Sequence, residues 1–101
     1  MNEPTFTGNR YPTEATLATI AKWSYPFDGL YDYLHAAWQS DYGRIFDKSD
    51  LTHFVTGGWS GNESIIEAMR ENQLLWSLCW QSSHRGGLTV MKFAALAEKQ
   101  P

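Results

Sequence analysis

The sequence predicts one small α+β domain, in which helices pack on one face of a four-stranded, antiparallel-dominated sheet. Its 101 residues, of which 43% are hydrophobic and 19% charged, suffice for one core and are typical of a globular chain. Apolar residues recur at helical spacing before residue 40 and in 61–71, and they alternate with a period of two in 42–56 and 74–93. The expected order is helix, helix, strand, strand, helix, strand, strand, which favours a sheet covered by helices on one side.

The first forty residues predict an arm followed by two helices. Residues 1–11 show no periodicity and are expected to form an N-terminal arm. The first helix should begin at Thr13, a favourable N-cap residue, and end near residue 23. The second, expected over 28–39 with Asp28 as its cap, has an apolar stripe formed by Leu30, Tyr31, Leu34, Ala37 and Trp38.

Two hairpins are predicted in the rest of the chain. Residues 42–46 and 51–56 alternate in polarity on either side of a polar turn at 47–50. Strict alternation over 74–82, with Trp76 and Trp80 on the apolar face, predicts a central strand. A turn at 83–87 and a last strand at 88–93 should follow, and 94–101 should form a frayed helical tail.

The most informative stretch is the glycine turn (57–63), where the first hairpin ends and the third helix begins. Ser60 and Glu63 have the spacing of a capping box, in which the Ser60 hydroxyl accepts the amide of Glu63. Three glycines within five residues permit a tight turn. The helix should run over 61–71, and Asn72 suits a left-handed C-terminal position.

Composition excludes several classes of protein. The net charge of −3 and scattered basic residues argue against binding to duplex nucleic acid. Cys79 is the only cysteine, so an internal disulfide is excluded and a reducing compartment is favoured. No apolar run approaches the roughly 20 residues of a membrane span, and the N-terminus lacks the pattern of a signal peptide. We therefore expect a cytoplasmic protein without a membrane partner.

Catalytic patterns are weak. Gly58-Trp59-Ser60-Gly61-Asn62 resembles a nucleophile elbow but lacks its final glycine, and the hydrolase sheet that carries such an elbow needs a much longer chain. The first amides of the third helix offer an anion site, with which the carboxylate of Glu63 would compete. The protein is expected not to be an enzyme.

Metal and cofactor sites are also not indicated. The three histidines, His35, His53 and His84, share no short spacing, and Cys79 has no activating cation near it in sequence. We therefore expect neither a metal nor a cofactor.

The aromatic residues offer a better candidate site. Trp59 is a large ring in a turn built from small residues, a position that suggests packing under the loop or contact with a ligand. Trp23, at the end of the first helix, shares this ambiguity. Arg85 would join Trp59 if the last hairpin lies beside the glycine turn. The candidate binding residues are Trp59, Asn62, Arg85 and Trp23.

Four features occur together in this chain: the stretch T-G-G-W-S-G-N-E at 56–63, two isoleucines in the following helix, W-x-x-x-W, and an Arg-Gly-Gly turn. In this combination the chain resembles a family of small proteins carried by phages and prophages. The resemblance covers roughly 42–93, and W-S-G-N-E is its specific part. No reaction is assigned to that family, so the resemblance implies a genetic setting. By analogy, small acidic proteins from such elements are often inhibitors of host defence, including anti-CRISPR proteins.

The sequence thus leads to a non-enzymatic protein that acts by contact with a host protein or protein complex in the bacterial cytoplasm, as a phage-encoded inhibitor of host defence. The alternative is a domain that binds a small molecule or nucleotide at the glycine turn through Trp59, Asn62 and Arg85. An enzyme is the weaker rival.

Overall fold

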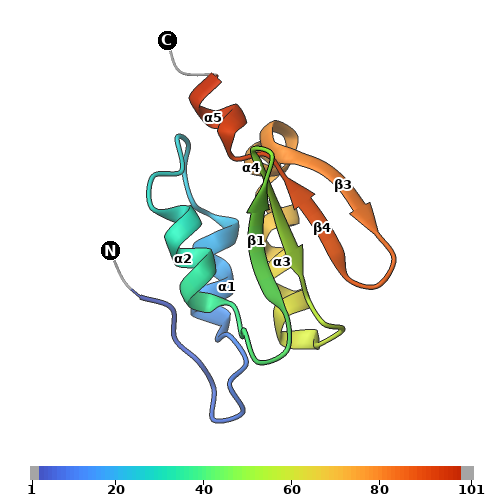
Figure 1. The fold of residues 1–101 in the computed structure, drawn as a ribbon. Coiled ribbons are helices and arrows are strands. Elements are labelled where there is room, and N and C mark those ends of the chain that lie inside the picture. The colour runs from blue at the N-terminus through green and yellow to red at the C-terminus, as the bar shows by residue number, and fades with distance from the viewer. Residues whose placement is uncertain (1–2, 99–101) are drawn as a thin grey trace.

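The computed structural model describes residues 3–98 and shows five helices and one four-stranded sheet (Figure 1). The elements in chain order are α1 (Glu14–Ala21), α2 (Leu30–Ala37), β1 (Arg44–Lys48), β2 (Leu51–Val55), α3 (Ser60–Glu71), α4 (Gln73–Cys79), β3 (Trp80–His84), β4 (Leu88–Met91) and α5 (Ala94–Glu98). All strand pairs are antiparallel, in the spatial order β1-β2-β4-β3. The predicted α+β class is confirmed.

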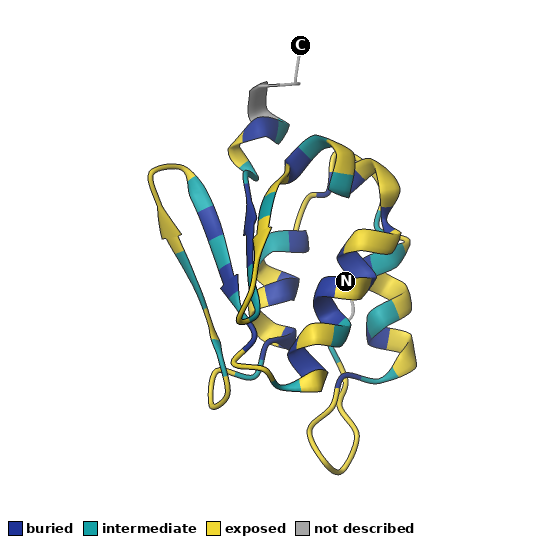
Figure 2. Cartoon of the chain, turned by 90° about the vertical axis from the view of Figure 1, so that its right-hand side faces the viewer, coloured by how far each residue is buried: buried dark blue, intermediate teal, exposed yellow. Residues whose placement is uncertain are grey.

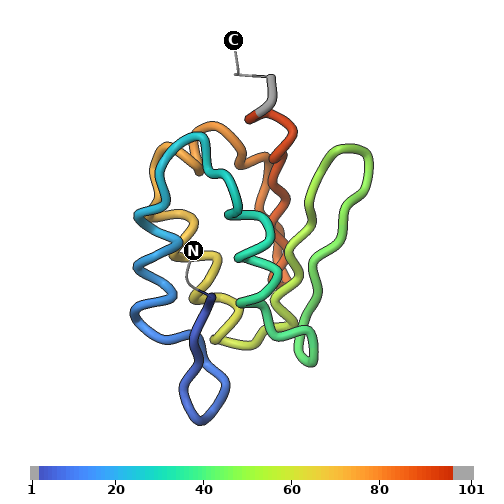
Figure 3. The backbone as a smooth tube through the Cα atoms, turned by 90° about the vertical axis from the view of Figure 1, so that its left-hand side faces the viewer, coloured from blue at the N-terminus to red at the C-terminus, as the bar shows by residue number. Residues whose placement is uncertain are grey.

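The three longer helices lie on one side of the sheet, and the core fills the space between (Figures 2 and 3). Phe54 of β2 is fully buried and meets Trp38, just after α2, at a ring distance of 5.5 Å. Ile65 and Met69 of α3 are fully buried in the same cluster. Their spacing of four residues places both on the helix face turned toward the sheet.

The two N-terminal helices begin differently. The hydroxyl of Thr13 accepts the amide of Thr16 at 3.2 Å, so the predicted cap of α1 is confirmed. The predicted cap at Asp28 is wrong, because α2 follows Gly29, which has a left-handed φ of 82° and provides no side-chain cap. Glycine adopts that conformation without steric cost.

The N-terminal arm is folded back on α1. Phe6 and Pro12 form an isolated β-bridge around a turn in which the Arg10 amide donates to the Thr7 carbonyl at 2.9 Å. The Thr5 amide donates to the Thr16 hydroxyl of α1 at 2.8 Å. The arm therefore has a defined path beside the first helix.

The turn between β1 and β2 is shorter than predicted. Lys48 pairs with Leu51, which leaves only Ser49 and Asp50 in the loop. Both have positive φ, 55° and 66°. Two-residue hairpin turns favour that backbone because its twist matches that of the strands.

The predicted central strand at 74–82 is wrong. Residues Gln73–Cys79 form α4, and only Trp80–His84 form a strand, β3, which lies at the edge of the sheet. Leu75 and Cys79, four residues apart, are fully buried, so the helical period of this run outweighs its alternation. Trp76 is half-buried and Trp80 is 41% exposed, so these rings do not fill the core as expected.

Asn72 is the reason that the chain turns from α3 into α4. Its φ of −81° is not the predicted left-handed value. The side-chain Oδ1 accepts the Leu75 amide at 3.3 Å, and Nδ2 donates to the carbonyls of Ile20 and Trp23 at 3.0 and 2.9 Å. Asn72 therefore caps α4 and ties it to the end of α1.

The C-terminal segment continues as α5 after β4. Residues Ala94–Glu98 are helical, and Ala95 is buried. The part of the predicted tail at 99–101 lies outside the described residues.

Candidate functional site

Three aromatic side chains from distant parts of the chain meet at the N-terminal end of α3. Trp59, the residue before α3, stacks on Tyr42 with ring centroids 4.8 Å apart and an interplanar angle of 25°. Tyr11 of the arm lies against the same indole, at 4.8 Å and 42°. Tyr42 is 48% exposed and Tyr11 37%, whereas Trp59 is half-buried. We call Tyr11, Tyr42 and Trp59 the aromatic end surface.

Glycine determines where these rings lie. A Cβ on Gly61 would overlap the Trp59 ring, so glycine lets the indole fold back on the first turn of α3. Gly57, with φ at 70°, packs so closely on the Tyr42 carbonyl that any Cβ would overlap it. Because larger residues would displace a ring or its backbone, the small residues of this turn position Trp59 and Tyr42.

Ser60 does not form the predicted capping box. The N-cap of α3 is Trp59, whose carbonyl accepts the Glu63 amide at 3.1 Å, and Ser60 is the first helical residue. The Ser60 hydroxyl is hydrogen bonded instead to the Tyr11 hydroxyl at 2.9 Å. The long-range partner from the arm replaces the local one that the sequence pattern suggests.

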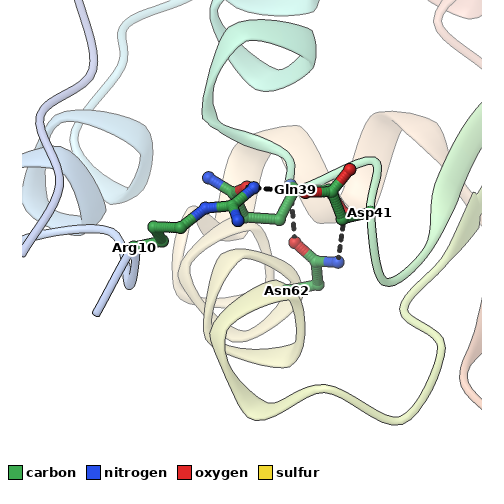
Figure 4. Close-up of polar contacts among 4 residues, drawn as sticks. All are labelled: Arg10, Gln39, Asp41 and Asn62. Carbon is green, nitrogen blue, oxygen red and sulfur yellow. Dashed lines mark hydrogen bonds and ion pairs between the residues drawn. The ribbon is translucent and has the colours of Figure 1, made fainter. Parts of the chain in front are cut away.

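Asn62 supports the aromatic end surface from beneath. It is fully buried, and its Oδ1 accepts the Gln39 amide at 3.0 Å (Figure 4). Its Nδ2 donates to the carbonyls of Gln39 and Thr56, at 3.2 and 3.4 Å. Its side chain has no exposed surface in this structure, so it holds the loop before β1 and the glycine turn together.

A second tie joins the arm to the same loop. The Arg10 Nη2 donates to the Gln39 Oε1 at 2.8 Å and pairs with an Asp41 carboxylate oxygen at 2.5 Å (Figure 4). These side chains are exposed, so the pair contributes little to global stability. Its position nevertheless keeps the arm that carries Tyr11 beside the loop that carries Tyr42.

Arg85 lies in the turn between β3 and β4, and that turn adjoins the glycine turn. The Thr56 amide donates to the Gly87 carbonyl at 2.9 Å, and a Cβ on Gly87 would overlap the Thr56 hydroxyl. Arg85 is exposed. Among the described residues, the cation–π pairs join Arg44 to Phe46 and Arg70 to Trp76, so the ring of Trp59 has tyrosine neighbours rather than Arg85.

Trp23 lies at the other end of the domain. Its carbonyl is bonded to Asn72, just after α3, whereas Trp59 stands just before α3. The 12 residues of α3 separate these positions by about 18 Å. Trp23 is half-buried, donates its Nε1 to the Asp28 carbonyl at 3.1 Å and meets Tyr33 edge to face. The structure therefore does not bring Trp23 together with Trp59.

A polar groove of about 250 Å³ separates α3 from the β3–β4 hairpin beside the glycine turn. Glu63 and Arg70 of α3 and Ser83 of β3 are among its lining residues. Two amides of the turn already have acceptors: Gly58 donates to the Thr56 hydroxyl at 3.1 Å and Trp59 to the Thr56 carbonyl at 3.3 Å. They are therefore not free to bind an anion.

Metal-ligating and nucleophilic groups are dispersed. No group of three or more His, Cys, Asp or Glu residues within 3–98 is arranged to hold a metal ion. Burial raises the pKa of the Cys79 thiol to about 11, so the thiol is protonated at neutral pH.

Sequence reasoning missed Tyr11 and Tyr42, which belong to segments expected to be an arm and a strand. Nothing in their local sequence links them to Trp59. The pairing results from the path of the arm and from the buried Asn62, both of which are tertiary features.

No family model, curated protein or solved structure matches this chain. Within the part of the chain that the structure describes, no helix has both the length and the apolar character required to cross a membrane.

Proposed function

We propose that this protein is a binding module that contacts a partner protein through the aromatic end surface, with the neighbouring Arg85 turn at its margin. The observation that carries the proposal is the convergence of three distant segments that fix two exposed tyrosines on one tryptophan. Tyrosine, tryptophan and arginine dominate the binding energy of many protein interfaces.

The rigidity of the surface supports this function. Glycines 57 and 61 and the buried Asn62 hold the rings before any partner arrives. Aromatic side chains with few torsions lose little entropy when they are bound, and preorganisation reduces the free-energy cost further.

A narrower form of the proposal is a phage-encoded inhibitor of a host defence complex, such as an anti-CRISPR protein, acting in the bacterial cytoplasm. This form depends on the resemblance over roughly residues 42–93, whose specific part is W-S-G-N-E. The contact surface itself does not depend on it.

The experiment places a photo-crosslinking amino acid at position 42 or, as a matched control, at position 25, and exposes both proteins to bacterial lysate. Tyr25 is 42% exposed, close to the 48% of Tyr42, but it follows α1, at the end of the domain away from Trp59. We expect one protein to crosslink at position 42 and not at 25. In a titration with that protein, Tyr42→Ala should weaken binding about tenfold or more, and Tyr25→Ala should not.

The same crosslinked protein at both positions would show that the contact is not specific to this surface. Equal affinity of wild type and Tyr42→Ala, with both proteins folded, would contradict the proposal.

Binding of a small molecule or nucleotide at the glycine turn is the second candidate, and the groove beside α3 is the observation that favours it. The geometry supports it less. Ligand pockets commonly exceed about 300 Å³, and the amides of Gly58 and Trp59 are already bonded internally.

A further inference from the structure

The pairing register of the four strands shows which residues lie on the face of the sheet turned away from the helices. We call it the open face, since no helix of the described chain crosses it (Figure 2). Two rows of side chains run across it: Phe46, His53, Val90 and Ser82 form one, and Arg44, Val55, Leu88 and His84 form the next. Lys48 and Leu51 pair beyond the first row. Alternation along a strand places all of these on the same side.

The charge of the open face is opposite to that of the whole chain. The chain has a net charge of −3, yet every ionisable side chain in these rows is basic. Asp47, the only acidic residue within the four strands, belongs to the other face, where it accepts hydrogen bonds from Thr52 and from Tyr31 of α2. Asp50 lies in the turn beyond the rows. Arg85 adds a cation at the β3–β4 end of the sheet.

The open face also carries a stack of planar groups. The rings of Phe46 and His53, on adjacent strands, are 4.7 Å apart and nearly parallel at 10°. The guanidinium carbon of Arg44 lies 4.9 Å from the Phe46 centroid. Arg44 and Lys48 are exposed, and both rings of the pair are half-buried. Planar aromatic and guanidinium groups are the surfaces on which unpaired bases stack.

We propose that the open face binds single-stranded nucleic acid. The basic residues neutralise phosphates, and the Arg44–Phe46–His53 stack receives a base. A duplex presents phosphates but keeps its base faces covered, whereas a single strand presents both. An acidic peptide would pair with the basic side chains but would offer no planar base to stack on the Arg44–Phe46–His53 group.

The dimensions of the face suit a short stretch of strand. Arg44 and His84 stand on the two outer strands, three inter-strand spacings or about 14 Å apart. Lys48 lies four residues from Arg44 on β1, about 13 Å along the strand. A bound strand can therefore cross the sheet between these basic residues.

The test is fluorescence anisotropy of the full chain with a labelled oligothymidine of about 12 nucleotides, a length within the range of known single-strand sites. The two permanent cations of the rows, Arg44 and Lys48, predict a salt slope of about −1.4, so raising the salt from about 50 to about 200 mM should weaken binding roughly sevenfold. Arg44→Gln or Lys48→Gln should each reduce the slope by about 0.7. Lys22→Gln, which removes an exposed cation after α1, is the matched control and should change nothing.

A ring variant separates stacking from charge. Phe46→Leu should lower affinity severalfold and leave the salt slope unchanged, because it removes a planar group and no cation. A thermal melt of each variant verifies that it is folded.

Three outcomes would overturn the proposal. The first is no binding of oligothymidine at low salt. The second is equal competition by polyglutamate or by vesicles of anionic lipid, which would show a general preference for negative charge. The third is an equal loss of affinity in Lys22→Gln, which would place binding outside the open face.

Discussion

Both ends of α3 are fixed by a buried asparagine, but the two asparagines hold different structures. Asn62, in the first turn, bonds to the loop before β1 and to the glycine turn. Asn72, just after the last turn, bonds to the end of α1 and caps α4. The first secures loops that carry exposed rings, and the second secures helix against helix. Buried amides can therefore order a surface whose own side chains remain in water.

The aromatic groups near the two ends differ accordingly. At the N-terminal end, the rings of Tyr11, Tyr42 and Trp59 come from three separate segments. At the C-terminal end, Trp76 and Trp80 stack 6.1 Å apart and are neighbours in sequence, separated by one helical turn. Only the first arrangement depends on tertiary structure for its existence.

The largest predicted effect is that of Asn62→Ala. It leaves the Gln39 amide and two carbonyls without their partner, and we expect it to lower the free energy of unfolding by about 3 kcal/mol. Asn72→Ala should cost less, about 2 kcal/mol, because the Asn72 side chain keeps a small exposed fraction of 6%, whereas Asn62 is fully buried. Urea unfolding of both variants measures the difference. A greater loss of unfolding free energy in Asn72→Ala than in Asn62→Ala would contradict this prediction.

Gly61→Ala should destabilise the protein by about 2 kcal/mol, because the new methyl group overlaps the Trp59 ring. Gly8→Ala is the control, since a Cβ there meets nothing within 4 Å. In the double variant Gly61→Ala/Trp59→Ala the overlap is gone. The double variant should therefore lose less stability than the sum of the losses in the two single variants. Strict additivity would show that the ring is not what the glycine accommodates.

A change of pH should alter the stability of the protein through the contact between α2 and β1. It should not act through the asparagines, which do not titrate. Hydrogen bonds from Thr52 and then from Tyr31 hold the pKa of Asp47 below its usual value. The stability that this carboxylate contributes is therefore present above about pH 4 and is lost as the pH falls further. Asp47→Asn should remove that part of the acid dependence, whereas Asn62→Ala should shift the whole stability curve.

Tyr31 sets the upper pH limit of the stability that the same contact contributes. Burial, followed by the hydrogen bond to Asp47, raises the pKa of Tyr31 to about 12. Its contribution is complete below about pH 10 and is lost as the pH rises toward 12. Tyr31→Phe should remove this alkaline loss in denaturant titrations, and persistence of the loss would assign it to another group.

Ser60→Ala should have the smallest effect, about 0.5 kcal/mol, because it removes one exposed hydrogen bond to Tyr11. Thr13→Ala removes a true N-cap and should cost about 1 kcal/mol. Tyr11→Phe should reproduce the loss in Ser60→Ala and add nothing to it. A loss in Ser60→Ala as large as in Thr13→Ala would restore a capping role for the serine.

The fold was predictable where local patterns and tertiary packing agree. The Thr13 cap, the first hairpin and α3 follow from short-range signals, and the α+β class follows from them. The prediction for 74–82 failed because the apolar residues of this run fit both a period of two and a helical spacing. The burial of Leu75 and Cys79, four residues apart, favours the helix.

The candidate site was predictable only in part. The small residues around Trp59 indicated that a large ring needed special accommodation, whereas the adjacency of the two turns was only a condition that the sequence left open. Tyr11 and Tyr42 could not be found, since their positions depend on how the arm folds back. The buried state of Asn62 is equally a property of the assembled loops.

The hydrogen bond between Tyr11 and Ser60 joins residues 49 positions apart, whereas β1 and β2 pair across a two-residue turn. Contacts that close long stretches of chain cost more entropy and form later than local ones. The aromatic end surface should therefore assemble after the folding transition state, once the hairpins and α3 are in place. Tyr11→Phe is expected to accelerate unfolding in stopped-flow measurements and to leave the folding rate unchanged. The surface proposed to meet a partner would then be the last part of the domain to be completed during folding.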